Sequence, residues 1–248
     1  MASKDVVVLH SGGQDSTTAL AWAIAQWGRR HIYPVTFDYG QRHAVEMEQA
    51  DKITSALDVP EAHVIDAGAL RDLGAAALTN TNIDVELKAS PDRGGAPMTE
   101  YNTYAAEHNL PSTFVPGRNM LFFTLAAAYG AGFGSSTLVT GVCATDRAGY
   151  PDCRVEFVSA AERALTLALD EDVHILAPLL RRSKSDTFAL AEELGVLELV
   201  LEQTHTCYHG DRSQRHDWGY GCGECPACDE RRRGWEEFRH SKFVNKLP

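Results

Sequence analysis

A short loop with two adjacent glycines joins an apolar run to a helix-forming run near the start of the chain. The apolar run is Val6–Leu9, the helix-forming run covers 19–27, and the loop reads Ser11-Gly12-Gly13-Gln14-Asp15-Ser16-Thr17. Glycine adopts positive φ and lets the backbone approach a ligand, while the first amides of the following helix are unpaired donors reinforced by the helix dipole. The loop therefore predicts a phosphate site at a strand-to-helix junction, and the alternative is a tight turn without a ligand.

The side chains of this loop favour a nucleotide over a plain turn. Hydroxyls and a carboxylate suit phosphate oxygens and a bound metal ion, and they crowd this turn as Ser11, Asp15, Ser16 and Thr17. No Gly-Lys-Ser/Thr follows, so the loop is not a Walker loop, and Gly-x-Ser-x-Gly is absent as well. The segment resembles the pyrophosphate loop of the N-type ATP pyrophosphatases, which cleave ATP between the α and β phosphates.

Short apolar or β-branched runs alternate with helical stretches along the chain. This alternation is typical of a parallel sheet with helices on both faces, and it predicts a Rossmann-like, doubly wound α/β fold of the adenine nucleotide alpha hydrolase type. A polar segment at 79–112 carries Pro91, Pro97, Pro111 and Gly94-Gly95, so we expect an insertion there, which is a lid over the site, a partner-binding arm or a tolerated surface loop. The expected strands are 6–9, 32–37, 63–65, 138–140 and 173–176.

Three loops should meet at one edge of this sheet. Open parallel sheets bind ligands at the carboxyl ends of their strands. The glycine loop, Phe37-Asp38-Tyr39-Gly40 and Gly141-Val142-Cys143 each follow an expected strand. They predict a single crevice.

Charge and hydropathy indicate which class of partner the chain binds and in which compartment it lies. The 248 residues carry 23 basic and 34 acidic side chains, a net charge of −11, which disfavours nucleic acid as the main partner and favours a small substrate. The start of the chain has too few apolar residues for a signal peptide, so we expect a reducing cytoplasm. The longest apolar stretch, 120–134, is shorter than a membrane span and predicts a buried helix.

Four cysteines near the end of the chain have the spacing of a metal site. Cys222, Cys225 and Cys228 are separated by two residues each, and Cys207 lies upstream. Four thiolates make a closed, tetrahedral zinc site, so we expect one structural zinc ion per chain that folds the C-terminal segment and braces the loop it contacts. The alternatives are dithiol redox chemistry, an iron–sulfur cluster, or replacement of Cys207 as ligand by a nearby histidine among His205, His209 and His216.

Five separated motifs together resemble one family, the 7-cyano-7-deazaguanine synthases. They are the glycine loop through Thr18, Phe37-Asp38-Tyr39-Gly40-Gln41-Arg42-His43, Phe114-Val115-Pro116-Gly117-Arg118-Asn119, Gly149-Tyr150-Pro151-Asp152-Cys153-Arg154 and the four cysteines. The resemblance implies a ligase that adenylates the carboxylate of 7-carboxy-7-deazaguanine with ATP, lets ammonia displace AMP, and then activates and dehydrates the amide to a nitrile for queuosine-type synthesis. It also implies a homodimer.

The resemblance also assigns roles to residues. Asp15 and Ser16 would position Mg²⁺, and Ser11, Asp15, Ser16, Arg118 and Arg154 would be catalytic. The guanidinium of Arg118 or Arg154 can make two parallel hydrogen bonds to a carboxylate or phosphate. Asp152 could accept hydrogen bonds from the N–H groups at the edge of a guanine-like base. The ATP-binding set is His10, Ser11, Gly12, Gly13, Gln14, Asp15, Ser16, Thr17, Thr18, Ala19, Leu20, Phe37, Gln41, Arg42, His43 and Gly141. The substrate-binding set is Tyr39, Asn119, Tyr150, Asp152 and Arg154.

The chain departs from the family pattern at three places. Ala144, Arg147 and Ala148 replace hydrogen-bonding and aromatic residues, the 79–112 insertion is long, and 212–220 extend the gap between Cys207 and Cys222. Because of these departures, an alternative function stays open: a related enzyme that joins the activated carboxylate to another amine, such as one on a protein, and stops at the amide. A non-catalytic nucleotide-binding scaffold and a pyrophosphatase acting on tRNA are the remaining alternatives.

The chain is expected to divide into two parts. Residues 1–200 form the nucleotide-binding α/β domain with the 79–112 insertion, and residues 201–248 form the zinc-binding C-terminal segment.

Overall fold

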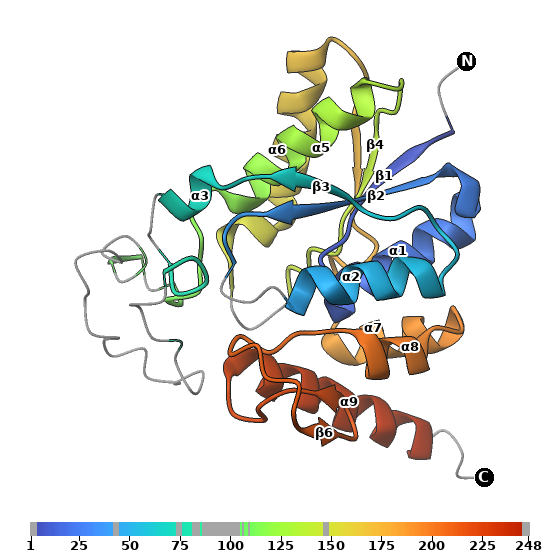
Figure 1. The fold of residues 1–248 in the computed structure, drawn as a ribbon, viewed down its shortest axis with the longest axis vertical. Coiled ribbons are helices and arrows are strands. Elements are labelled where there is room, and N and C mark those ends of the chain that lie inside the picture. Colours follow the sequence, from blue (N-terminus) through green and yellow to red (C-terminus); the bar gives the residue numbers. More distant parts are fainter. Residues whose placement is uncertain are drawn as a thin grey trace.

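Five parallel strands form the central sheet of this protein, which we describe from a computed structural model (Figure 1). The structure describes residues 4–41, 45–72, 76–80, 85, 105, 107–108, 110–145 and 149–244. The sheet order is β3-β2-β1-β4-β5, and every neighbouring pair is parallel. The predicted α/β class is confirmed. The strands are β1 (Val6–Leu9), β2 (Ile32–Asp38), β3 (His63–Asp66), β4 (Thr137–Val139) and β5 (His174–Leu176).

The order of the strands reverses beside β1. This strand is buried along its whole length because it pairs with β2 on one side and β4 on the other, with Val6 opposite both Ile32 and Thr137. An all-apolar strand fits such a position, since both of its faces are covered. The carboxyl ends of β1 and β4 therefore flank the point at which doubly wound sheets bind ligands.

Helices cover both faces of the sheet (Figure 1). One face packs on α5 (Arg118–Ala131) and α6 (Val155–Leu169), where Phe123 and Val158 join the core. The other face packs on α1 (Gln14–Trp27) and α2 (Val45–Ala56) through Leu20 and Ile53. The buried helix expected at 120–134 is α5. Shorter elements are η1 (Arg29–His31), α3 (Ala69–Asp72) and η2 (Pro151–Cys153).

A further layer of helices lies beyond α1 and α2 (Figure 1). It consists of α7 (Lys184–Glu193), α8 (Leu197–Gln203), α9 (Pro226–Val244) and the hairpin of β6 (Arg215–His216) and β7 (Gly219–Tyr220). One hydrophobic cluster runs from Phe188 and Val200 to Trp235 and Phe238. The packing therefore continues across residue 200, and the division of the chain at that position stays a prediction.

Ser183 and Asp186 form a capping box at the start of α7. The Ser183 Oγ accepts from the Asp186 N–H at 3.1 Å, and the Asp186 carboxylate accepts from the Ser183 N–H at 2.9 Å. This reciprocal capping box fixes the first turn of α7, with Lys184 at its first position.

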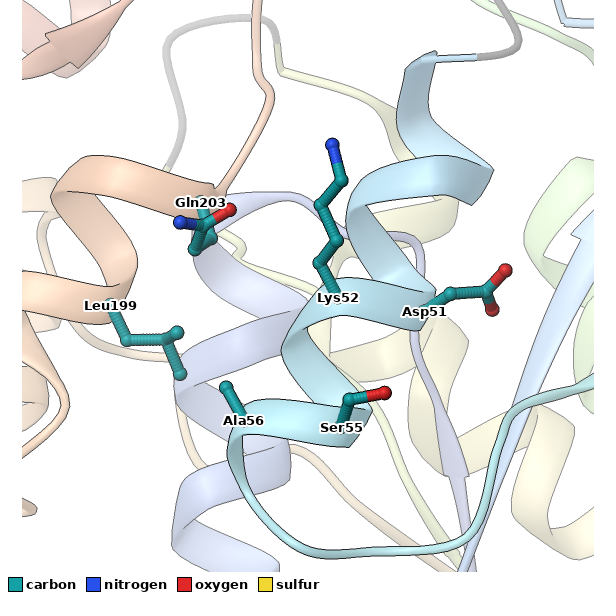
Figure 2. A pocket seen from close by; sticks show the side chains of 6 residues that line it. All are labelled: Asp51, Lys52, Ser55, Ala56, Leu199 and Gln203. Carbon is teal, nitrogen blue, oxygen red and sulfur yellow. The ribbon is translucent and has the colours of Figure 1, made fainter.

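A hollow lies between α2 and α8 (Figure 2), with Ala56 facing Leu199 and with Lys52 between Gln203 and Asp51. In the described part of the chain, no helix combines the length and apolar character of a membrane span. Most of 79–112 lies outside the described residues. Of its described part, Val85 packs with Ala77 and Tyr208, so the insertion reaches the C-terminal segment there.

Candidate active site

The glycine loop connects β1 to α1, as its sequence predicts. Gly12 has φ +78°, and a Cβ built there would lie 2.4 Å from the Glu46 carbonyl oxygen. Gly13 is the N-cap of α1 and has no side chain to cap the helix, while its own N–H donates to the Ser11 Oγ at 3.4 Å. The Ser16 Oγ accepts from the Ser11 N–H at 3.1 Å and donates to the Gly13 carbonyl at 3.2 Å. The loop is therefore held in shape while its helix N-terminus stays available to an anion.

Gly141, at the carboxyl end of β4, lies directly against this loop. A Cβ built on Gly141 would be 2.7 Å from the Ser16 nitrogen and 2.8 Å from the Asp15 carbonyl carbon. Only glycine allows the two loops this approach. Two of the three predicted loops are thus packed together at one sheet edge.

Lys184 brings a cation to the phosphate loop. Its Nζ lies 2.7 Å from the Asp15 Oδ2, and the two side chains are 11% and 22% exposed. The capping box at Ser183 sets the position of Lys184 at the start of α7. Sequence reasoning missed this lysine. A lysine beside a capping box that follows the end of β5 is the signal that could have found it.

A second group of polar side chains surrounds Arg118, at the start of α5. The Arg118 guanidinium carbon lies 5.9 Å from the ring centre of Tyr150, and Arg118 also hydrogen-bonds Tyr39 at the end of β2. Burial acts to lower the pKa of Arg118, but Tyr39, Tyr150 and Asp152 outweigh it and raise the pKa above its usual value. The result is a permanent cation among aromatic rings.

Asp152 and Asn119 lock this group together. The Asn119 backbone N–H donates to the Asp152 Oδ2 at 3.2 Å, and the Asn119 side-chain amide donates to the Asp152 carbonyl at 2.8 Å. Asp152 is 6% exposed. The Tyr150 hydroxyl is 2.6 Å from the Thr113 Oγ1. Four of the five predicted substrate residues therefore gather around Arg118, namely Tyr39, Asn119, Tyr150 and Asp152.

Glu46 links the two groups. It lies in the first turn of α2, its backbone carbonyl faces Gly12, and its carboxyl is close enough to Arg118 to interact electrostatically. Burial raises the pKa of Glu46 to about 7, although the Arg118 cation acts in the opposite direction. A partly buried acid with a pKa near neutrality, between a phosphate loop and an arginine, is suited to proton transfer.

Protein stability should report the pKa of Glu46. Because the folded pKa of about 7 exceeds the ordinary value of 4.5, the contribution of Glu46 to stability is fully present below pH 4.5 and is lost as pH rises toward 7. Between pH 4.5 and pH 7, the unfolding free energy of the parent should therefore decrease by on the order of 3 kcal/mol more than that of Glu46→Gln, which has no titrating group at this position. Urea unfolding at several pH values measures this. The control is Glu48→Gln, at an exposed position of the same helix. Identical pH profiles for Glu46→Gln and the parent would contradict the assignment.

The remaining predicted ATP residues fall into three groups. Thr17, Thr18, Ala19 and Leu20 are fully buried within α1, and Gln14 is 1% exposed. Phe37 stacks on Phe122 at 4.1 Å in the core, and Gln41 bridges its own turn by accepting from the Tyr39 N–H and donating to the Phe37 carbonyl. Arg42 and His43 lie outside the described residues, as do Arg147 and Ala148. The roles of these residues stay predictions.

His10 and Arg154 lie in contrasting surroundings. His10 is 2% exposed beneath the loop, and burial lowers its pKa to about 4, so the ring is neutral at neutral pH. It can support the loop but brings no positive charge to phosphate. Arg154 is the exposed N-cap residue of α6. Its predicted role therefore depends on a bound ligand.

The four predicted cysteines form one cluster. Their sulfur atoms lie within 4.8 Å of one another, with Cys222 and Cys228 at 3.9 Å and Cys207 and Cys225 at 4.0 Å. Sulfur atoms around a tetrahedral zinc with bonds of about 2.3 Å lie about 3.8 Å apart. The Glu224 and Cys225 N–H groups donate to the Cys222 sulfur at 3.4 and 3.3 Å. The cluster therefore fits a zinc ion.

Two of the three nearby histidines, His205 and His216, have other partners. His205 is 1% exposed and its Nε2 lies 3.0 Å from the Cys207 carbonyl, while the His216 Nε2 lies 2.9 Å from the Gly221 carbonyl and its ring stacks on Trp218. The metal-binding group found among the described residues contains the four cysteines and no histidine. The extension at 212–220 forms the β6–β7 hairpin, and Arg212 from it donates to the last carbonyls of α8.

The strand order, the glycine loop between β1 and α1, and the cysteine cluster define the class of this protein, a doubly wound α/β domain with a C-terminal four-cysteine cluster that could hold a metal ion. The chain matches the family described as "Queuosine biosynthesis protein QueC" over residues 5–239. It belongs to this family, as the sequence motifs predict.

Curated relatives are similar over almost the whole chain. The 7-cyano-7-deazaguanine synthase of Wolinella succinogenes is 47% identical over 97% of this chain and 96% of its own length. The enzyme of the same name from Hyphomonas neptunium is 45% identical over 95% of both chains. Among solved structures, the NMN synthetase of Francisella tularensis is 16% identical over 99% of this chain and 88% of that chain, with a TM-score of 0.47.

Proposed function

We propose that this protein is a 7-cyano-7-deazaguanine synthase that uses ATP to convert 7-carboxy-7-deazaguanine and ammonia into the nitrile, a queuosine precursor. Full-length relatives that carry this name support the overall reaction. The observation that best supports this chemistry is that the glycine loop and the group around Arg118 lie close together. Glu46 contacts the phosphate loop at Gly12 and faces Arg118, so a nucleotide and a carboxylate would be held side by side.

Adenylation overcomes the poor leaving group of a carboxylate. A carboxylate oxygen attacks the α phosphorus of ATP, pyrophosphate leaves, and the acyl carbon then carries AMP as its leaving group. The amides at the start of α1 and the Lys184 ammonium would take the negative charge of the departing pyrophosphate. Asp15 and Ser16 offer the oxygen ligands that Mg²⁺ prefers, and the ion would neutralise phosphate charge when bound.

Ammonia then attacks the acyl carbon, AMP leaves, and the attacking nitrogen gives up a proton to form the amide. Glu46, with a pKa near 7, is placed to accept that proton. The amide oxygen attacks the α phosphorus of a second ATP and pyrophosphate leaves. Loss of AMP and of the two N–H protons from this adenylated amide then gives the nitrile. Arg118 would hold the substrate carboxylate, and the buried Asp152 would accept from the purine edge.

Product masses test this proposal. The protein is incubated with ATP, Mg²⁺, 7-carboxy-7-deazaguanine and ammonium, and we expect the nitrile together with AMP and pyrophosphate. An amide that accumulates without nitrile, with a deazaguanine adduct on a protein, would favour the amide-forming alternative. Tight ATP binding without any pyrophosphate release would favour the non-catalytic scaffold. A reaction without ammonium is the control for the source of nitrogen.

Lys184 should be needed for ATP binding. We expect Lys184→Met to raise the dissociation constant for ATP by about 10- to 100-fold, because a charge-assisted contact to phosphate is lost. Calorimetric titration with ATP measures this. Lys242→Met is the control, since Lys242 pairs with Glu192 on the surface and is 41% exposed. An unchanged dissociation constant for Lys184→Met would remove this lysine from the phosphate site.

A further inference from the structure

Helix α9 buries an arginine in the layer behind the phosphate loop. Arg231 is 1% exposed, and its Nε donates to the Trp218 carbonyl at 2.8 Å. Its Nη2 donates to the Val200 carbonyl at 2.9 Å. Its Nη1 donates to the hydroxyls of Thr204, at 2.8 Å, and Thr206. Burying a cation is costly unless its donors are satisfied, and here each guanidinium nitrogen has a partner.

The acceptors of Arg231 include two residues of a short segment, 204–207, which we call the strap. The strap lies against the glycine loop, since the His205 N–H donates to the Gly12 carbonyl at 2.9 Å. A Cβ built on Gly13 would lie 3.4 Å from the His205 carbonyl oxygen. The strap ends at Cys207, one of the four clustered cysteines. Arg231 therefore holds the segment that supports the back of the phosphate loop.

The same face of α9 also contacts Lys184, which pairs with the glycine loop. Gly234 lies three residues after Arg231, and residues with this spacing share a helix face. A Cβ built on Gly234 would lie 2.7 Å from the Lys184 Cβ and 2.9 Å from the Lys184 carbonyl carbon. Lys184 in turn pairs with Asp15 of the loop at 2.7 Å. A side chain at position 234 would displace the lysine that reaches the loop.

We propose that Arg231 and Gly234 are positioning residues of the phosphate site. Arg231 fixes the strap behind Gly12, and Gly234 leaves the space in which Lys184 reaches Asp15. This inference rests on the proposed function, in which the loop holds the phosphates of ATP. Cys228 lies in the first turn of the same helix, so the metal cluster and the phosphate site share one rigid element.

Matched variants of α9 test the proposal. Arg231→Lys keeps the charge, but a single ammonium cannot reach acceptors on three segments. Arg233→Lys is the control, because Arg233 is 45% exposed and pairs with Asp229 on the surface. For each full-length, zinc-loaded variant, calorimetry gives the ATP dissociation constant and kinetics give KM for each substrate. We expect Arg231→Lys to weaken ATP binding about tenfold, with unchanged zinc content and an unchanged KM for the deazaguanine carboxylate.

Gly234→Ala separates positioning from folding. Alanine favours a helix over glycine by up to about 1 kcal/mol, so helix propensity alone predicts a neutral or more stable protein. We expect instead a loss of ATP affinity of about tenfold. In the Lys184→Met background, Gly234→Ala should cause no further loss, because its effect acts through that lysine.

The outcomes separate cleanly. An ATP dissociation constant within twofold of the parent in folded, zinc-containing Arg231→Lys or Gly234→Ala protein would overturn the proposal for that residue. If Arg231→Lys does not fold, Thr206→Val removes one acceptor on the strap and is judged by the same criterion. If the parent chain binds no ATP, both the proposed function and this inference are overturned. If the parent binds ATP and the variants bind it equally well, only the inference is overturned.

Discussion

Replacing Gly12 with alanine is expected to abolish ATP binding and to destabilise the fold. Gly12 has φ +78°, and the added Cβ would lie 2.4 Å from the Glu46 oxygen, 2.8 Å from the Ala50 nitrogen and 3.3 Å from the Gln49 carbonyl carbon. All three are backbone atoms of α2, so no side-chain rotation relieves the clash. Either α2 moves away or the loop changes shape. We expect a loss of on the order of 3–5 kcal/mol in unfolding free energy, from backbone strain and overpacking together.

Gly28→Ala is the matched control for this prediction. Gly28 has nearly the same φ, +79°, but nothing lies within 4 Å of an added Cβ. Backbone strain from an alanine at this positive φ costs about 1–3 kcal/mol on its own. Urea unfolding and ATP calorimetry on both variants distinguish the effect of backbone strain at positive φ from the effect of the clash between the added Cβ and α2. Equal effects of the two substitutions would show that contact with α2 does not matter at Gly12.

The fold was predictable because its signals are local. The apolar run Val6–Leu9 can be covered on both faces only at the centre of a sheet, and the glycine loop after it marks a strand that turns into a helix. Cys-x-x-Cys spacing likewise brings sulfur atoms together without help from distant residues. The boundaries shifted by one or two residues, as at β2, which extends to Asp38.

The parts of the site that escaped prediction depend on tertiary contacts. Glu46 looks like an ordinary first-turn acid until α2 packs against Gly12, and Lys184 gains its role only when α7 lies beside the loop. Arg231 is one of three consecutive arginines, and sequence alone does not distinguish the buried one from Arg232 and Arg233. Phe37 follows the common pattern of an aromatic residue at a strand end, since it stacks on Phe122 in the core, and its contact with ATP stays a prediction.

Removing one cysteine of the cluster should unfold the C-terminal segment. Cys225 is 0% exposed, and its sulfur lies 4.0 Å from that of Cys207. Structural zinc sites contribute on the order of 10 kcal/mol to folding, which is as large as the stability of a whole domain. We therefore expect Cys225→Ser to lower zinc content from one ion per chain to none and to cause a large fall in Tm. Because the strap ends at Cys207 and supports Gly12, ATP affinity should fall as well.

The control for this prediction is Cys143→Ser, outside the cluster. Cys143 is 5% exposed, and its sulfur is 3.1 Å from both the Arg182 carbonyl and the Thr145 Oγ1, contacts that a serine hydroxyl can keep. A colorimetric zinc assay, thermal unfolding and near-ultraviolet circular dichroism of Trp218 and Trp235 follow metal, stability and local packing together. Trp218 and Trp235 pack in the same hydrophobic cluster as Cys225, so their signal should collapse in Cys225→Ser but not in Cys143→Ser. Retention of one zinc ion by Cys225→Ser, or a parent chain that binds iron instead, would contradict a four-cysteine zinc site.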